Sequence, residues 1–423
     1  MTKQEISLKW QALREHFDSR GADGEAVVSA FKEVYSMYTE AIPAWLAGLY
    51  DHSVGGFYYS NSARDNEYQE GDGIKNYFLP DIESTNQALN LLLNSGMISS
   101  FEQLPKEMRD KIAEYVCSLL DAEDGYIYHP QWGKNISDSR KGRDLNWAVD
   151  MSRKLGFDLP YPTAYDRLRA LRTAEGDDKE KKSAALPEHL TSKENFVKYL
   201  ESFDWIENSY YAGNAVAAQG RQIIAAGLTD VCVEYLNKFQ NPKNGFWSEK
   251  SDMHYGINGF LKITAFYIDA GAPINMAELA ADSTIALLTS EEIGTTVCHL
   301  YNCYYALRNI LTSLRKAGDT AAADRVAAKL LTVAPEAIRA ARFKTEVFRK
   351  ADGAFSYHRA CSSFKSQQAW VAIKDTPESD VNASVLCTSG LINNIYQAFD
   401  AQEYRVPLFS DEDFEIFMKN LKL

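Results

Sequence analysis

The sequence predicts an all-α fold in which helices of two kinds alternate, one kind forming an outer ring and the other an inner ring. Three observations support this. Nearly every long segment has the three–four spacing of apolar residues that amphipathic helices show, as in the run from Val27 to Ile42. One motif recurs at the starts of six helices, and a short Gly-aromatic turn precedes four of them.

The recurring motif reads Asp, aliphatic, Glu or Asn, any residue, small. It is clearest in 81–85, 144–148 and 380–384, and looser versions place Asn214, Asn258 and Asn302 at the third position. Successive copies of that position are 63, 68, 44, 44 and 80 residues apart. Periods of this size indicate an array built from one repeated supersecondary unit.

Twelve helices follow from this pattern. The charged amphipathic set suits an outer ring and spans about 25–48, 105–120, 193–204, 229–239, 276–289 and 320–348. The less charged set carries the motif, suits an inner ring and spans about 81–95, 144–155, 212–226, 256–270, 299–316 and 380–398. We expect a single domain over 1–423, with a flexible charged insertion at 173–193 that lengthens a hairpin loop.

The Gly-aromatic turns predict small β-ribbons over one end of the molecule. They begin at Gly56, Gly125, Gly245 and Gly353. Together with the alternating helices and the run Pro80–Thr85, the turn Gly55-Gly56-Phe57-Tyr58-Tyr59 resembles the (α/α)6 toroids. That superfamily includes terpenoid-cyclase and prenyltransferase-like proteins, polysaccharide lyases and glycoside hydrolases. The resemblance covers the whole chain but is architectural, and it implies an (α/α)6 barrel whose inner helices start around one mouth.

Composition limits the partners. A net charge of −13 argues against nucleic-acid and anionic-membrane surfaces, which need a cationic footprint. The N-terminal residues lack the apolar stretch of a signal peptide, no apolar run is long enough to span a bilayer, and the six cysteines form no disulfide pattern. We therefore expect a cytoplasmic protein with a small-molecule or oligosaccharide ligand and without a cofactor. The oligomeric state stays open.

The predicted site is a ring of polar side chains at the mouth. The ring consists of Glu83, Asn146, Asn214, Asn258, Asn302 and Asn382. These residues either contact a hydroxyl-rich ligand or link neighbouring helices by hydrogen bonds. We expect Asp81, Asp144 and Asp380 to cap their helices. The aromatic residues predicted to face the cavity are Tyr59, Trp132, Trp247 and Tyr357.

Four histidines, His129, His254, His299 and His358, fall near the same mouth. Two reactions fit the pattern. A glycoside hydrolase needs two carboxyl groups, and Glu83 with Asp380 or Asp81 could supply them, because the first and last repeats adjoin when a ring closes. Glu249 and Asp252 are further candidates. A polysaccharide lyase needs a base and a group that neutralises a uronate carboxylate. His254 or Tyr255 could serve as the base, with Asn258 and Arg359 as partners. Hydrolysis is preferred, because toroids that act inside the cell commonly trim short glycans.

Three alternatives remain. The chain could be a non-catalytic glycan or metabolite binding protein on the same toroid, a scaffold, or a terpenoid-cyclase or prenyltransferase-like enzyme. Zinc would need a fuller ligand set than the pairs Cys298-His299 and His358/Cys361 offer, so no metal is expected.

Overall fold

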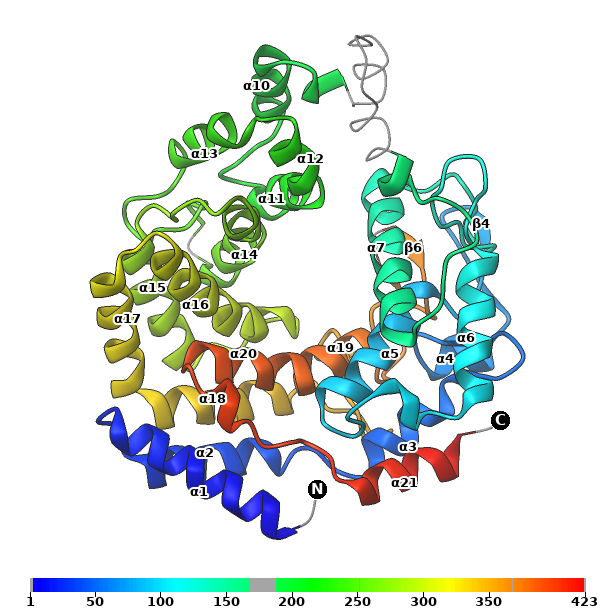
Figure 1. The fold of residues 1–423 in the computed structure, drawn as a ribbon, viewed down its shortest axis with the longest axis horizontal. Helices are drawn as coiled ribbons and strands as arrows, with labels where there is room; N and C mark the ends of the chain where they lie inside the picture. The colour runs from blue at the N-terminus through cyan, green and yellow to red at the C-terminus, as the bar shows by residue number, and fades with distance from the viewer. Residues whose placement is uncertain (1–2, 168–187, 251, 367, 422–423) are drawn as a thin grey trace.

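The computed structural model describes residues 3–167, 188–250, 252–366 and 368–421. Most of these residues are helical and the few strands are short, which confirms the all-α class (Figure 1). Most of the predicted insertion at 173–193 lies outside the described residues. Its described end contains a 3-10 turn at Glu188–Leu190 and the first residue of α10 (Lys193–Glu201).

The motif-bearing helices are present close to their predicted positions. They are α5 (Ile82–Asn94), α7 (Asp138–Leu155), α11 (Ser209–Ala218) with α12 (Gly220–Ala225), α14 (Met253–Ala270), α16 (Cys298–Lys316), and α19 (Val381–Val385) with α20 (Leu391–Ala398). A π-helical segment, η3 (Leu386–Gly390), joins α19 to α20. Each of the motif-bearing helices contacts the next one along the chain. α19 also contacts α5, so the last motif-bearing segment meets the first. They lie around a common centre in Figure 1.

The outer set is also present, with two differences. It comprises α2 (Gly24–Tyr35), α3 (Ala41–Gly48), α6 (Lys106–Ser118), α10, α13 (Thr229–Asn237), α15 (Ala277–Thr289), α17 (Thr320–Thr332) and α18 (Ala334–Glu346). The predicted helix 320–348 is broken into α17 and α18, with Pro335 in the first turn of α18. Proline fits there because a first-turn N–H has no helical partner, whereas inside one continuous helix it would remove a hydrogen bond. The predicted helix 25–48 is likewise interrupted, between α2 and α3.

Two terminal helices complete the packing. The sequence analysis did not predict α1 (Lys3–Ser19) or α21 (Asp411–Asn420). α1 packs on α2 and α21 packs on α3 (Figure 1). Leu13, Phe17 and Phe417 are fully buried in these contacts and belong to the same continuous core as the inner helices.

Two of the three predicted aspartate caps are confirmed. Asp81 and Asp380 have extended backbones, and their carboxylates accept hydrogen bonds from Ser84 N at 2.9 Å and from Ala383 N at 2.7 Å. The prediction for Asp144 is wrong. α7 begins two turns earlier, where Ser137 caps it, so Asp144 lies inside the helix. There it pairs with Arg140, one turn back.

The Gly-aromatic turns form tight reversals between an outer segment and the next motif-bearing helix. β1 (Tyr50–Asp51) pairs with β2 (Gly56–Phe57), and single bridges join Leu120 to Ile127 and Arg349 to Phe355. The fourth turn closes with a backbone hydrogen bond from Asn241 N to Phe246 O, at 2.7 Å. Three of the four predicted ribbons are therefore present but very short, and the described residues around Gly245 form a turn without strand pairing.

Two further hairpins were not predicted. β3 (Tyr68–Gly71) pairs with β4 (Ile74–Tyr77), and β5 (Lys365–Ser366) pairs with β6 (Ala369–Trp370). Asp72 joins the two hairpins, because it accepts a hydrogen bond from Trp370 Nε1 at 3.1 Å and forms an ion pair with Lys365. A small separate core that includes Tyr59, Phe78 and Trp370 supports them. The second hairpin places Ser366 against Glu83.

Candidate functional site

Glu83, at the start of α5, is buried in a network of polar contacts. It is only 1% exposed. One carboxylate oxygen accepts from the Ser366 hydroxyl at 2.5 Å and pairs with Arg140 at 2.8 Å, and the other lies 3.5 Å from Arg143 Nη2. Because two guanidinium groups of α7 surround this carboxylate, they fix its position on the inner side of the helix.

Arg140 is the centre of this network and is itself fully buried. Besides Glu83, its guanidinium lies 2.9 Å from Asp144 and 3.7 Å from Asp81. The rings of Trp132 and Trp147 lie 5.0 and 5.5 Å from its central carbon. Burial raises the pKa of Asp144 to about 7, although the Arg140 charge opposes that shift. One buried cation thus holds carboxyl groups from two helices together.

A second group of side chains lies on neighbouring inner helices: Arg143 of α7, Tyr210 of α11 and Lys262 of α14. The Lys262 ammonium lies 5.5 Å from the centre of the Tyr210 ring. Burial and, after it, the nearby Arg143 charge lower the pKa of Lys262 to about 8, although Cys298 and Glu83 oppose the shift. Lys262 is half-buried and Tyr210 is 37% exposed, so both keep surface that a ligand could contact.

Cys298 begins α16 and meets the turn before α19. Its thiol lies 3.3 Å from the Tyr357 hydroxyl, and this neighbour raises the pKa of Tyr357 even more than burial does. Asp380 lies next to Tyr357 and is fully buried. The backbone N–H of Tyr357 donates to its carboxylate at 2.7 Å. Burial raises the pKa of Asp380 to about 7, and backbone hydrogen bonds only partly offset that. Burial and, after it, the neighbouring Asp380 and Glu83 raise the pKa of the buried Tyr59 hydroxyl.

The predicted ring of amides is divided among local partners. Asn302 donates to Asn258 at 2.5 Å, linking α16 to α14, and Gln87 donates to Asn382 at 3.1 Å, linking α5 to α19. Asn146 is exposed and accepts from Tyr165 at 3.0 Å, and Asn214 is half-buried. These amides are therefore held by partners within the protein, and the Asn302–Asn258 and Gln87–Asn382 hydrogen bonds each join two helices.

The predicted aromatic residues have different surroundings. Trp247 is fully buried beside Phe260 and Tyr267, and its indole N–H donates to Leu236 O at 2.8 Å, so it leaves no surface for a ligand. Trp132 is half-buried and stacks on His129, with ring centres 4.1 Å apart.

The histidine and tyrosine candidates form a separate cluster at the start of α14. His254 stacks on His299, with ring centres 4.9 Å apart, and its Nδ1 lies 3.4 Å from Asp252. The Lys250 ammonium lies 3.6 Å from the centre of the Tyr255 ring. Burial lowers the pKa of His254 and brings that of His299 to about 4, which favours neutral rings at physiological pH.

The last two candidates lie in the loop before α19. His358 is half-buried, and its backbone N–H donates to Cys361 O at 3.0 Å. The Arg359 side chain donates to the carbonyl groups of Gly294 and Ile293, which ties this loop to the loop before α16. Arg359 is therefore engaged in holding two loops together.

The sequence motif did not include Arg140, Arg143 or Tyr210. The one usable signal was the i, i+4 spacing of Arg140 and Asp144, which predicts a pair on one helix face only if the helix extends upstream of Asp144. Lys262 is four residues after Asn258, on the same face of α14. Its place in the site depends on the side chains of α7 and α11, which the spacing along α14 does not predict.

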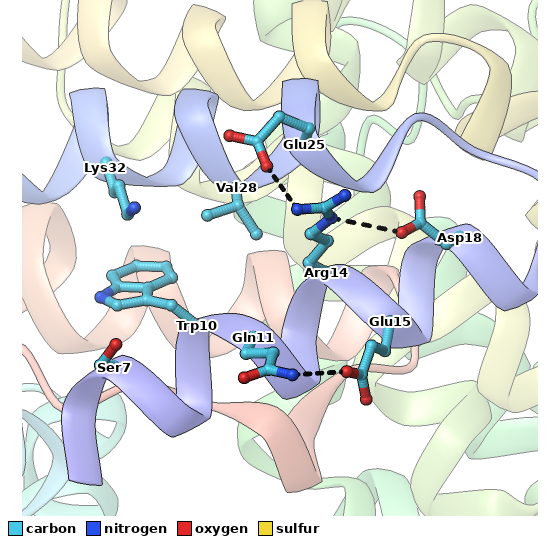
Figure 2. A pocket seen from close by; sticks show the side chains of 9 residues that line it. All are labelled: Ser7, Trp10, Gln11, Arg14, Glu15, Asp18, Glu25, Val28 and Lys32. Carbon is cyan, nitrogen blue, oxygen red and sulfur yellow. Dashed lines mark hydrogen bonds and ion pairs between the residues drawn. The ribbon is translucent and has the colours of Figure 1, made fainter. Parts of the chain in front are cut away.

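A groove of about 550 Å³ lies elsewhere, between α1 and α2 (Figure 2). Several of its polar side chains are paired with one another, since Arg14 contacts Glu25 at 3.1 Å and Gln11 donates to Glu15 at 2.9 Å. None of the candidate site residues lines it. The candidate residues lie instead on α5, α7, α11, α14 and α16 and around the turn before α19, with Lys262 near the middle of α14.

Comparison with known proteins identifies no matching family model, no similar curated protein and no similar solved structure. Among the described residues, no group of three or more His, Cys, Asp or Glu side chains is placed to hold a metal ion. None of the described helices combines the length and apolar character needed to cross a membrane.

Proposed function

We propose that the chain is an (α/α)6 toroid whose interior binds a carbohydrate and cleaves a glycosidic bond. The observation that carries this proposal is the convergence of chemically capable groups from separate inner segments. These groups are Glu83, Arg143, Tyr210, Lys262, Cys298, Tyr357 and Asp380. Charged, phenolic and aromatic groups around one centre suit a ligand that is rich in hydroxyls and has flat apolar faces.

The exposure of these groups favours β-elimination over hydrolysis. Hydrolysis needs carboxyl groups that reach the substrate, but Glu83 is 1% exposed and Asp380 is fully buried with both oxygens accepting backbone N–H groups. The groups that keep accessible surface are a phenol, an amine and a guanidinium, at Tyr210, Lys262 and Arg143. A phenol near a cation suits proton abstraction, and the Arg143 charge lowers the pKa of Tyr210, although burial and the nearby Cys298 and Glu83 raise that pKa overall.

We assign the base to Tyr210, with Tyr255 as the second candidate. Tyr210 has open surface and the Lys262 ammonium beside its ring. Hydrolysis remains the second candidate function, because an Asp380 carboxyl with a pKa near 7 can hold a proton at neutral pH. Access to it would require movement of the loop that contains Tyr357.

The test is an activity screen on oligosaccharides of hexuronic acids and on neutral oligosaccharides. Elimination is followed by the ultraviolet absorbance of an unsaturated product, and hydrolysis by new reducing ends without that absorbance. For elimination, Tyr210→Phe should lower turnover by about 10²–10⁴-fold, whereas Tyr161→Phe, at an exposed tyrosine elsewhere, should leave it unchanged. New reducing ends without the ultraviolet absorbance would reject elimination in favour of hydrolysis.

A further inference from the structure

Exposed apolar side chains gather on the β3–β4 hairpin. Among the described residues, four of the ten large apolar side chains that are exposed lie within 68–79. They are Tyr68, Ile74, Tyr77 and Leu79, with 40, 61, 50 and 39% of their surfaces exposed. Single exposed apolar residues are ordinary, but a group of them at one place marks an interaction site. The hairpin is therefore a candidate binding surface.

The two faces of this hairpin differ. The inner face packs on the protein, because Asn76 is buried and a β-carbon at Gly71 would lie 2.3 Å from the Trp370 ring. Side chains alternate between the faces of a strand, so Tyr68 and Tyr77, which pair directly across the strands, both lie on the outer face. Their ring centres are 5.7 Å apart. The outer face thus presents two neighbouring phenol rings.

Charged groups flank these rings. Glu70 and Lys75 are exposed, pair directly across the strands and share the outer face with the tyrosines. The Lys75 ammonium lies 4.4 Å from the centre of the Tyr68 ring and covers part of it, so Tyr77 offers the more open ring. A sugar fits such a surface, because its apolar face packs on a ring while its hydroxyls bond to a carboxylate and an ammonium. An apolar protein surface would instead leave both charges without hydrogen-bond partners.

The hairpin is fixed in place before any ligand binds. Asp72, at its turn, accepts a hydrogen bond from Trp370 Nε1 at 3.1 Å and forms an ion pair with Lys365. Gln69, on the inner face, accepts from Lys374 N at 2.8 Å. Because these contacts hold the strands on the β5–β6 hairpin, little ordering of the outer face is needed when a ligand binds.

The hairpin also adjoins the candidate site. Tyr77 is six residues before Glu83, and an extended chain spans about 3.3–3.6 Å per residue, so their Cα atoms lie no more than about 22 Å apart. The β5–β6 hairpin, on which the inner face packs, reaches Glu83 through the Ser366 hydroxyl. A glycan of several residues is long enough to span this distance.

We propose that the outer face of the β3–β4 hairpin is a second carbohydrate-binding site, where Tyr77 and Tyr68 pack against sugar rings of a glycan whose end occupies the interior. This inference rests on the proposed function, since it gives the same ligand a further place to bind. Tyr77 makes the main contact, and Glu70 and Lys75 bond to hydroxyl groups. The site favours long glycans over short ones.

The test is isothermal titration of the whole protein with hexasaccharides and disaccharides of galacturonate and of glucose. We expect at least one hexasaccharide to bind at least about tenfold more tightly than its disaccharide. Tyr77→Ala should remove most of that difference without weakening disaccharide binding, and Tyr77→Phe should retain the difference because the ring remains. The matched control is Tyr161→Ala, since Tyr161 is 47% exposed but lies outside the hairpin. This control should bind as the wild type does.

The outcomes separate this site from the proposed function. Equal affinities for long and short glycans, or a preference for length that Tyr77→Ala leaves intact, would overturn the second site. So would a dimer, seen by sedimentation equilibrium, that Tyr77→Ala dissociates, because the face would then join two copies of the chain. Tyr77-dependent binding of a hexasaccharide without cleavage of any glycan would support the site and reject the proposed function. A thermal melt verifies that Tyr77→Ala folds.

Discussion

Asp380 caps α19 with one carboxylate oxygen and holds the preceding turn with the other, through the N–H groups of Ala383 and Tyr357. Full burial makes its ionised form costly, so its pKa is raised from 3.8 to about 7. The residue therefore favours the fold most when it is protonated. This is opposite to the behaviour of an ordinary surface aspartate in an ion pair.

The pH dependence of stability follows from this shift. Below about pH 4, Asp380 is protonated in both the folded and the unfolded chain. Between about pH 4 and pH 7 only the unfolded chain loses the proton, so the free energy of unfolding should fall as pH rises. Asp380→Asn should make that decline shallower, because the amide caps the helix without titrating. The measurement is urea unfolding at several pH values.

Asp23→Asn provides the control, since Asp23 caps α2 from an exposed position and accepts from Ala26 N at 2.9 Å. In Asp23→Asn the free energy of unfolding should change with pH as it does in the wild type. An unchanged slope in Asp380→Asn would show that Asp380 does not carry a raised pKa in the folded protein.

At the residue scale, contacts between residues close in the sequence could be predicted, and contacts between residues from different helices could not. The caps at Asp81 and Asp380 depend on a side chain and a backbone N–H three residues apart, so the motif contains the information. Arg140 contacts carboxylates from two helices and two tryptophan rings, and no local pattern specifies that.

The Gly-aromatic turns are the elements that join outer segments to inner helices. Gly125 has φ of +76°, and a β-carbon there would lie 2.6 Å from the carbonyl oxygen of Pro162. Gly156, which ends α7, has a similar φ of +72° but open space around the same position. At Gly156 only the positive φ favours glycine. At Gly125 the close approach of another chain segment favours glycine as well.

Gly156→Ala should lower the free energy of unfolding by about 1–2 kcal/mol, the usual penalty of the left-handed region for an alanine. Gly125→Ala should cost more, because its methyl group also collides with backbone that cannot move away easily. Urea unfolding of both variants measures the difference. Equal losses would mean that the segment around Pro162 does not pack tightly on this turn.

Helix positions were largely predictable because amphipathic spacing is a local property. The break between α17 and α18 shows the limit, since Pro335 was included in one long predicted helix. The β3–β4 and β5–β6 hairpins were missed for a different reason. Both are short, and they are held by Trp370 and Asp72 rather than by a strong strand pattern of their own.

For the whole molecule, closure between the first and last motif-bearing helices decides whether distant residues can share one site. α19 contacts α5, and the Gln87–Asn382 hydrogen bond at 3.1 Å joins them. The repeated motif predicted this neighbourhood from its spacing. The same spacing could not predict which polar groups would be sealed inside and which would keep open surface. Glu83 and Asp380 are sealed, whereas Arg143 and Tyr210 remain reachable.

The measurement that tests the central claim most directly is a crystal structure of the protein with bound glucuronate. The account predicts the sugar in the interior, with its ring against Tyr210. A sugar bound only in the groove between α1 and α2, or an interior closed by the protein's own side chains, would contradict it.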